Sequence, residues 1–127
     1  MMSFLIVFIG AGIGGSIRHG VNLLAARLVG LSFPYGTISI NIVGSLLMGL
    51  CAAYFAFRGE DASQPWRLFL TTGILGGFTT FSAFSLDVAV LWERGDMVGA
   101  LLYVLGSVVL SILALFLALW LARSVLA

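Results

Sequence analysis

Four long apolar runs, separated by short polar segments, fill almost the whole chain. They cover about 3–29, 37–57, 66–92 and 97–126. Each run is long enough for the roughly 20 mostly apolar residues that a helix needs to cross a bilayer core. The pattern therefore predicts an all-α integral membrane protein, with a single four-helix transmembrane domain over residues 1–127.

The composition supports this class. Of the 127 residues, 61% are hydrophobic and 9% are charged, whereas soluble domains carry about 25% charged residues. The formal net charge of +1 gives no electrostatic basis for binding nucleic acid. The single cysteine, Cys51, excludes an intramolecular disulfide and a cysteine-rich metal site. We expect a multi-pass protein whose surroundings are membrane lipid.

The basic residues give almost no orientation signal. With four spans, three arginines lie on one side of the membrane and two or three on the other: Arg58, Arg67 and Arg123 against Arg27, Arg94 and, within the first run, Arg18. Membrane proteins are normally oriented by an excess of such charges on the cytoplasmic side. The balance fits either a weak signal or insertion both ways up. We favour dual topology, in which two copies pair antiparallel with the inverted symmetry known from larger transporters.

The third run contains an unusual stretch, Thr71 to Ser85, with three glycines, four threonines and two serines. Irregular backbone inside a membrane is tolerated only where protein buries it or where it lines a wet cavity. Gly76–Gly77 and the threonines after this pair predict a break of the third helix in mid-membrane. A break releases carbonyl oxygens, so two chains meeting there can hold a hard monovalent cation.

Enzymatic chemistry finds no support in the polar residues. The lone histidine, His19, cannot form a metal cluster, and Asp87 is the one carboxylate within a run rather than in a loop. The polar groups inside the runs are mostly neutral. Neutral N–H and O–H groups can replace part of an anion's hydration without holding the ion too tightly to leave. We therefore expect permeation and no enzyme.

The positions of three sets of residues refine this expectation of permeation. Phe81 and Phe84 share a helix face and can turn positive ring edges to an anion, although packing is the more common role of such a pair. A second group repeats every four residues and fits pore lining and interhelical hydrogen bonding equally well: Tyr103, Ser107 and Ser111. Arg18 either faces a water-filled mouth or extends its charge to the interface.

Residues 36–41, with Gly44, and residues 72–84 resemble the Fluc (CrcB-type) fluoride ion channels. The helix count and residues 14–18 agree, so the resemblance covers essentially the whole chain. It implies an antiparallel, dual-topology homodimer in the bacterial plasma membrane. Two pores in this dimer would export fluoride passively from the cytoplasm.

The resemblance also implies roles for single residues. Phe81 and Phe84 would form an aromatic fluoride box, Asn41 would donate its amide to the ion, and Arg18 would lie in the vestibule. The remaining polar positions would belong to a polar track or its surroundings: Thr37, Ser82, Tyr103, Ser107 and Ser111.

The resemblance further implies a structural sodium ion at the dimer centre, bound by the backbone carbonyls of Gly76 and Thr79. The chain departs from the family pattern at two positions. Ala83 replaces the usual hydroxyl residue between the two phenylalanines, and His19 replaces an aromatic residue after the arginine. The first departure removes a hydroxyl near the box, and the second alters the mouth.

Two other functions fit parts of the chain. A small proton-coupled cation or drug exporter would use Asp87 as its exchanging carboxylate. A non-transporting accessory subunit of a larger membrane complex would use the hydroxyl stripes to join helices.

Overall fold

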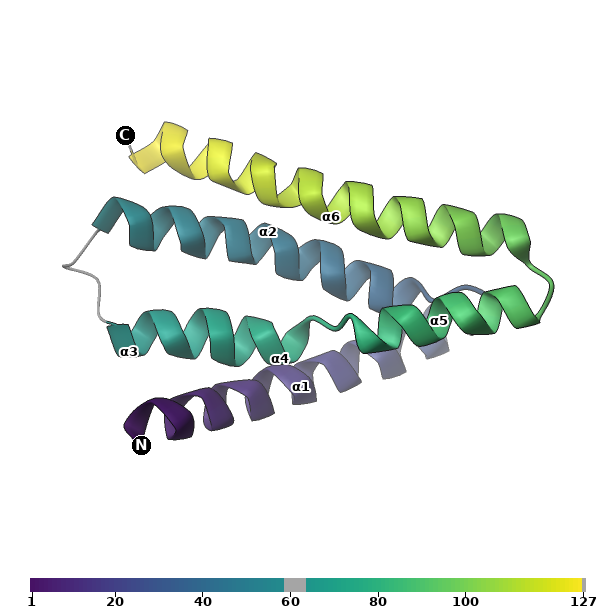
Figure 1. Ribbon diagram of the computed structural model, residues 1–127, viewed down its shortest axis with the longest axis horizontal. Helices are drawn as coiled ribbons and strands as arrows, with labels where there is room; N and C mark the ends of the chain where they lie inside the picture. The colour runs from purple at the N-terminus through teal and green to yellow at the C-terminus, as the bar shows by residue number, and fades with distance from the viewer. Residues whose placement is uncertain (59–63, 127) are drawn as a thin grey trace.

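The computed structural model describes residues 1–58 and 64–126, without the side chain of Arg58, and these residues are almost entirely helical (Figure 1). In the described part, four helices are long and apolar enough to cross a membrane: Met2–Val29, Tyr35–Phe57, Gln64–Glu93 and Met97–Leu126. Their ends lie within two residues of the predicted runs. The architecture is therefore compatible with a four-span membrane protein.

The first, second and fourth spans are each one continuous helix, whereas the third is built from several segments. The continuous helices are α1 (Met2–Val29), α2 (Tyr35–Arg58) and α6 (Met97–Leu126). The third span consists of α3 (Gln64–Arg67), η2 (Leu68–Leu75), α4 (Gly76–Phe78) and α5 (Ser82–Glu93). The η2 segment is a π-helix. This form is rare in proteins, and where it occurs it often lies at a functional site.

The helices lie side by side in two pairs, with both chain ends at the same end of the bundle (Figure 1). One pair is α2 with α6, and the other is α1 with η2 and α4. Glycines bring the second pair together. A Cβ at Gly14 would lie 2.0 Å from the Ile74 carbonyl oxygen, and one at Gly77 would lie 2.4 Å from the Ala11 carbonyl oxygen. Only glycine permits so close an approach of two backbones.

The third span leaves helical geometry between α4 and α5, as the thin green trace in Figure 1 shows. Thr79 is extended, with φ −82° and ψ 157°, and α5 begins at Ser82. We call residues 79–81 the interruption. Gly76–Gly77, predicted as part of the break, are helical. The prediction was wrong for these two glycines, because Gly77 contacts α1 instead, whereas Thr79 and Thr80 lie outside the helices.

Few side chains are buried, and the largest fully buried ones are Tyr103, Ile40 and Leu91. Leu91 and Tyr103 form a cluster with Ala100 near the turns that join α1 to α2 and α5 to α6. Large apolar side chains are exposed along α1 and α6. Such a surface is stable where hydrocarbon or another protein chain replaces water.

Candidate functional site

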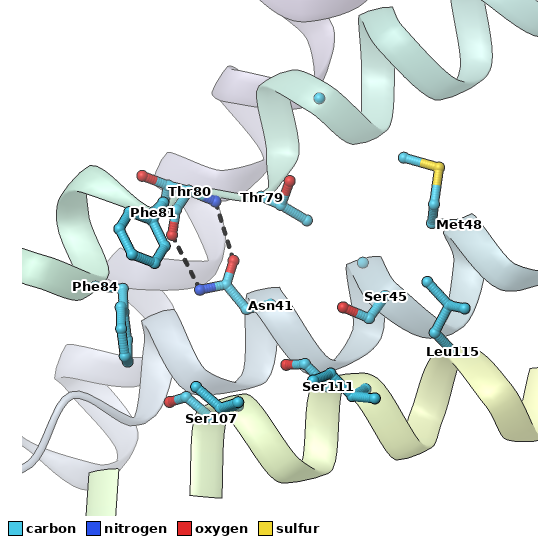
Figure 2. A pocket seen from close by; sticks show the side chains of 14 residues that line it. Asn41, Ser45, Met48, Thr79, Thr80, Phe81, Phe84, Ser107, Ser111 and Leu115 are labelled. Atoms are coloured by element: carbon cyan, nitrogen blue, oxygen red, sulfur yellow. Dashed lines mark hydrogen bonds between the residues drawn. The ribbon is translucent and has the colours of Figure 1, made fainter. Parts of the chain in front are cut away.

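A cleft of about 570 Å³ opens between α2, the interruption and α6 (Figure 2). It brings together five residues that the sequence singles out as an ion path: Asn41, Phe81, Phe84, Ser107 and Ser111. The described residues that line the cleft include no charged side chain. The polar groups of this described lining are therefore all neutral.

Asn41 ties the interruption to α2. Its Nδ2 donates to the Thr80 carbonyl oxygen at 3.0 Å, and the Thr80 amide donates to Asn41 Oδ1 at 3.0 Å (Figure 2). A side-chain amide has two N–H donors, so one remains for a ligand. Asn41 therefore combines a structural contact with a free donor at the cleft.

Two backbone amides in this region donate to side chains instead of to the helix carbonyl four residues earlier. In an α-helix the carbonyl of residue i accepts from the amide of residue i+4. The Thr80 amide, which would serve the Gly76 carbonyl, donates to Asn41. The Ala83 amide, which would serve the Thr79 carbonyl, donates to Thr80 Oγ1 at 3.2 Å. The carbonyl oxygens of Gly76 and Thr79, both beside the cleft, thereby lose their usual donors.

Ser107 and Ser111 differ from other helical serines of this chain. Four serine hydroxyls donate to the backbone carbonyl four residues earlier in the chain: those of Ser16, Ser39, Ser85 and Ser124. The buried Oγ atoms of Ser107 and Ser111 have no hydrogen-bond partner among the described residues. An unpaired buried hydroxyl costs about 1–3 kcal/mol. Both line the cleft, so a ligand there would satisfy them.

Tyr103 begins this stripe one turn before Ser107 and is fully buried, at 0% exposure. Its hydroxyl donates to Asp87 Oδ2 at 2.9 Å. Asp87, considered from the sequence as the carboxylate of a proton-coupled exporter, is therefore partnered in the folded chain.

The two phenylalanines are neighbours but have different surroundings. The ring centroids of Phe81 and Phe84 are 5.5 Å apart, with the planes tilted by 45°. Phe84 also contacts Tyr103, with centroids 5.2 Å apart. Phe81, in contrast, is 78% exposed. Its ring projects away from the core of its own chain.

Four other predicted pore residues do not line the cleft of Figure 2, whereas Gly76 and Thr79 do: Arg18, Thr37, Ser82 and Tyr103. Arg18 and Ser82 border a second cleft of about 470 Å³, and Thr37 borders a third of about 400 Å³ together with Asp87. Thr80 lines both the first and the second cleft. One chain therefore does not gather all the predicted residues in one cavity.

A protein-family model matches almost the whole chain and shows which family the chain belongs to. The family model described as CrcB-like protein, Camphor Resistance (CrcB), matches residues 5–119. The chain belongs to this family. The resemblance inferred from residues 36–41 and 72–84 is thereby confirmed.

Relatives of this CrcB-like chain match over most of their length. Fluoride-specific ion channel FluC 2 of Nitrobacter hamburgensis is 57% identical, over 96% of this chain and 98% of the relative. Fluoride-specific ion channel FluC of Mesorhizobium japonicum is 59% identical over 98% of each chain. The FluC of Methylobacterium nodulans is 66% identical over 85% of this chain and 86% of its own. All three are named as channels and none as an enzyme.

Two contacts in this CrcB-like chain have no signature in the sequence. The pair Asn41–Thr80 is separated by 39 residues, so no helical spacing links them. The pair Tyr103–Asp87 joins different helices. The burial of a tyrosine hydroxyl in an apolar run is the one signal that calls for such a partner.

Proposed function

We propose that the chain is a fluoride-selective channel that lets fluoride leave the cytoplasm passively through the bacterial plasma membrane. The observation that carries the proposal is a pair of buried hydroxyls, Ser107 and Ser111, that lack a partner in the described part of the chain and line a cleft whose described lining is uncharged. The names of the relatives, fluoride-specific ion channels, support the identity of the ion.

The cleft suits a small, strongly hydrated anion. Two hydroxyls and the remaining Asn41 N–H replace part of the hydration shell, and aromatic ring edges add a weak positive potential. Conduction requires binding weak enough for the ion to leave. Neutral donors meet this condition better than arginine would. Arg18, beside a separate cleft, raises the local anion concentration.

The functional unit in this proposal is an antiparallel homodimer in which each chain has inserted in the opposite orientation. The exposed ring of Phe81 and the open side of the cleft offer a surface for the second copy. The near balance of arginines supports insertion both ways up. Labelling of single cysteines in the turns from each side of the membrane tests this. Labelling from one side only would exclude dual topology.

A sodium ion between the two copies also fits the chain. Gly76 and Thr79 offer carbonyl oxygens whose usual donors are diverted, and oxygen is the ligand that hard cations prefer. Two oxygens from one chain are too few for a full shell, so both copies would contribute. The ion would tie the copies together and take no part in conduction.

The benefit to the cell follows from acid–base chemistry. Protonated fluoride crosses the membrane from acidic surroundings, ionises inside and is trapped as the anion, which a channel then lets out. Purified protein in liposomes should release trapped fluoride when potassium and valinomycin balance the charge. Release no faster than from protein-free vesicles would disprove the channel. Parallel vesicles loaded with chloride measure selectivity, and cation efflux driven by a pH gradient would indicate an exporter instead.

A further inference from the structure

Arg94 connects the end of α5 to the turn between α1 and α2. Its Nη1 donates to the Ser32 carbonyl oxygen at 3.0 Å and its Nη2 to the Leu31 carbonyl oxygen at 3.3 Å. A planar guanidinium with fixed donors can hold two successive carbonyls in one geometry. The contact joins residues more than 60 positions apart, 62 and 63 along the chain.

The backbone of Arg94 is itself held in place. Its amide donates to the Val90 carbonyl at 3.0 Å, and Gly95, at φ +82°, lets the chain turn back. The Asp96 amide then donates to the carbonyl of Leu91, a residue 1% exposed. Arg94 therefore extends from a fixed helix end, whereas residues 30–34, between α1 and α2, are not helical.

Phe33 follows directly after the two tethered carbonyls. Its ring meets the ring of Tyr103 edge-on, with centroids 5.5 Å apart and planes at 87°. Tyr103 contacts Phe84 at 5.2 Å, and Phe84 contacts Phe81 at 5.5 Å. A row of four aromatic rings thus leads from the turn to the cleft of Figure 2.

We infer that Arg94 is a positioning residue for the ion path, which holds the turn so that Phe33 fixes the ring of Tyr103 and, through it, Phe84. The inference rests on the proposed channel function. Arg94 borders the cavity shared by Phe33, Thr37 and Asp87, but it lies outside the cleft that holds Asn41, Ser107 and Ser111.

The alternative is that Arg94 acts only as a positive charge near a mouth of the path. Lysine separates the two roles, because it keeps the charge but lacks the planar pair of donors. If the charge alone matters, Arg94→Lys conducts like wild type. If the tether matters, Arg94→Lys loses flux as Phe33→Leu does, since both release the Tyr103 ring.

The test measures fluoride release from liposomes for wild type, Arg94→Lys, Arg94→Gln, Phe33→Leu and the double variants. The control is Arg27→Lys, which changes an exposed arginine in the last turn of α1. We expect each single variant to lose at least about fivefold in rate and each double variant to lose little more than its worse parent, as residues on one route do. The inference would be overturned if the rate losses of the two single variants multiplied in the double variant, or if Arg94→Lys released fluoride at the wild-type rate.

A second readout does not depend on transport. 4-Fluorophenylalanine placed at position 33 reports the surroundings of that ring by ¹⁹F NMR. We expect its resonance to shift or broaden in Arg94→Lys and Arg94→Gln but not in Arg27→Lys, and an unchanged spectrum would refute the tether. Absence of fluoride release from wild type would instead disprove the channel itself. Gel filtration shows which variants assemble. The NMR comparison needs only one of the two arginine variants, whereas the flux comparison of charge against tether needs Arg94→Lys.

Discussion

Asn41 and Thr80 exchange two hydrogen bonds of 3.0 Å, one in each direction, between α2 and the interruption. The backbone at Thr80 is therefore fixed by a side chain from another helix instead of by its own helix. Each such bond contributes about 0.5–1.5 kcal/mol, and leaving a buried partner unpaired costs more. The shape of the interruption, and with it the placement of the Phe81 ring, depends on this one amide.

Asn41→Asp should reduce fluoride release by at least about tenfold, the equivalent of one lost interaction of about 1.4 kcal/mol. The carboxylate can still accept from the Thr80 amide, but it faces the Thr80 carbonyl oxygen without a proton and adds negative charge to the cleft. Ser39→Ala on the same helix is the control, because the Ser39 hydroxyl donates to the Tyr35 carbonyl within α2. Wild-type release from Asn41→Asp would show that the pair does not shape the path.

Ser107→Ala and Ser111→Ala should reduce transport without reducing stability. Removing a buried hydroxyl without a partner relieves a penalty of about 1–3 kcal/mol, so resistance to unfolding should stay equal or rise. Fluoride release should fall because the ion loses a donor. Ser124→Ala is the control, because the Ser124 hydroxyl donates to the Trp120 carbonyl. This variant should release fluoride at the wild-type rate. Lower stability together with full release would mean that these serines join helices and do not bind the ion.

The spans were predictable because hydropathy and helix geometry are local properties. Runs of about 20 apolar residues appear directly in the sequence, and the observed ends lie within two residues of the predicted ones. The stripe of Tyr103, Ser107 and Ser111 was predictable for the same reason, since a spacing of four places residues on one helix face. The structure adds that the hydroxyls of Ser107 and Ser111 have no partner within residues 1–58 and 64–126.

The location of the interruption was not predictable from glycine content. Glycine serves both irregular backbone and close helix packing, and at Gly77 the neighbour that requires it is Ala11 on α1. The choice between the two roles depends on a contact between helices. The same holds for Thr80, whose partner lies 39 residues away, and for Arg18, which tertiary packing places beside a different cleft from Asn41.

Gly14→Ala should weaken the fold through the contact of α1 with η2. The added Cβ would lie 2.0 Å from the Ile74 carbonyl oxygen, which belongs to rigid backbone. Overpacking of this kind costs about 1–3 kcal/mol or more. Gly12→Ala should be neutral or stabilising, because an added Cβ would meet no atom of another described segment within 4 Å and alanine favours helices. Unfolding in a denaturing detergent compares the two, and equal stability of both variants would contradict the close approach.

Phe81→Leu and Phe84→Leu should both impair fluoride release while the proposed dimer stays assembled. The Phe81 ring is 78% exposed, so its loss should leave the unfolding of the single chain almost unchanged. Phe84 packs on Tyr103, so its replacement should also lower stability, by about 1 kcal/mol. Phe116→Leu is the control, because that ring is exposed on α6. Full release in both phenylalanine variants, with gel filtration unchanged, would remove their role in the path.

In the proposed dimer with a sodium ion between its copies, removal of sodium should weaken the association of the two chains. An ion bound only by the assembled dimer stabilises it, by about 2.7 kcal/mol at a hundredfold excess over its dissociation constant. The dimer in detergent should therefore dissociate at a lower temperature in N-methylglucamine chloride than in sodium chloride of equal ionic strength. Thr79→Val should keep this difference, because the proposed ligand is the backbone carbonyl and the hydroxyl is bonded to Leu75. Equal dissociation temperatures in the two salts would rule out the cation at Gly76 and Thr79, whatever the fluoride measurements show.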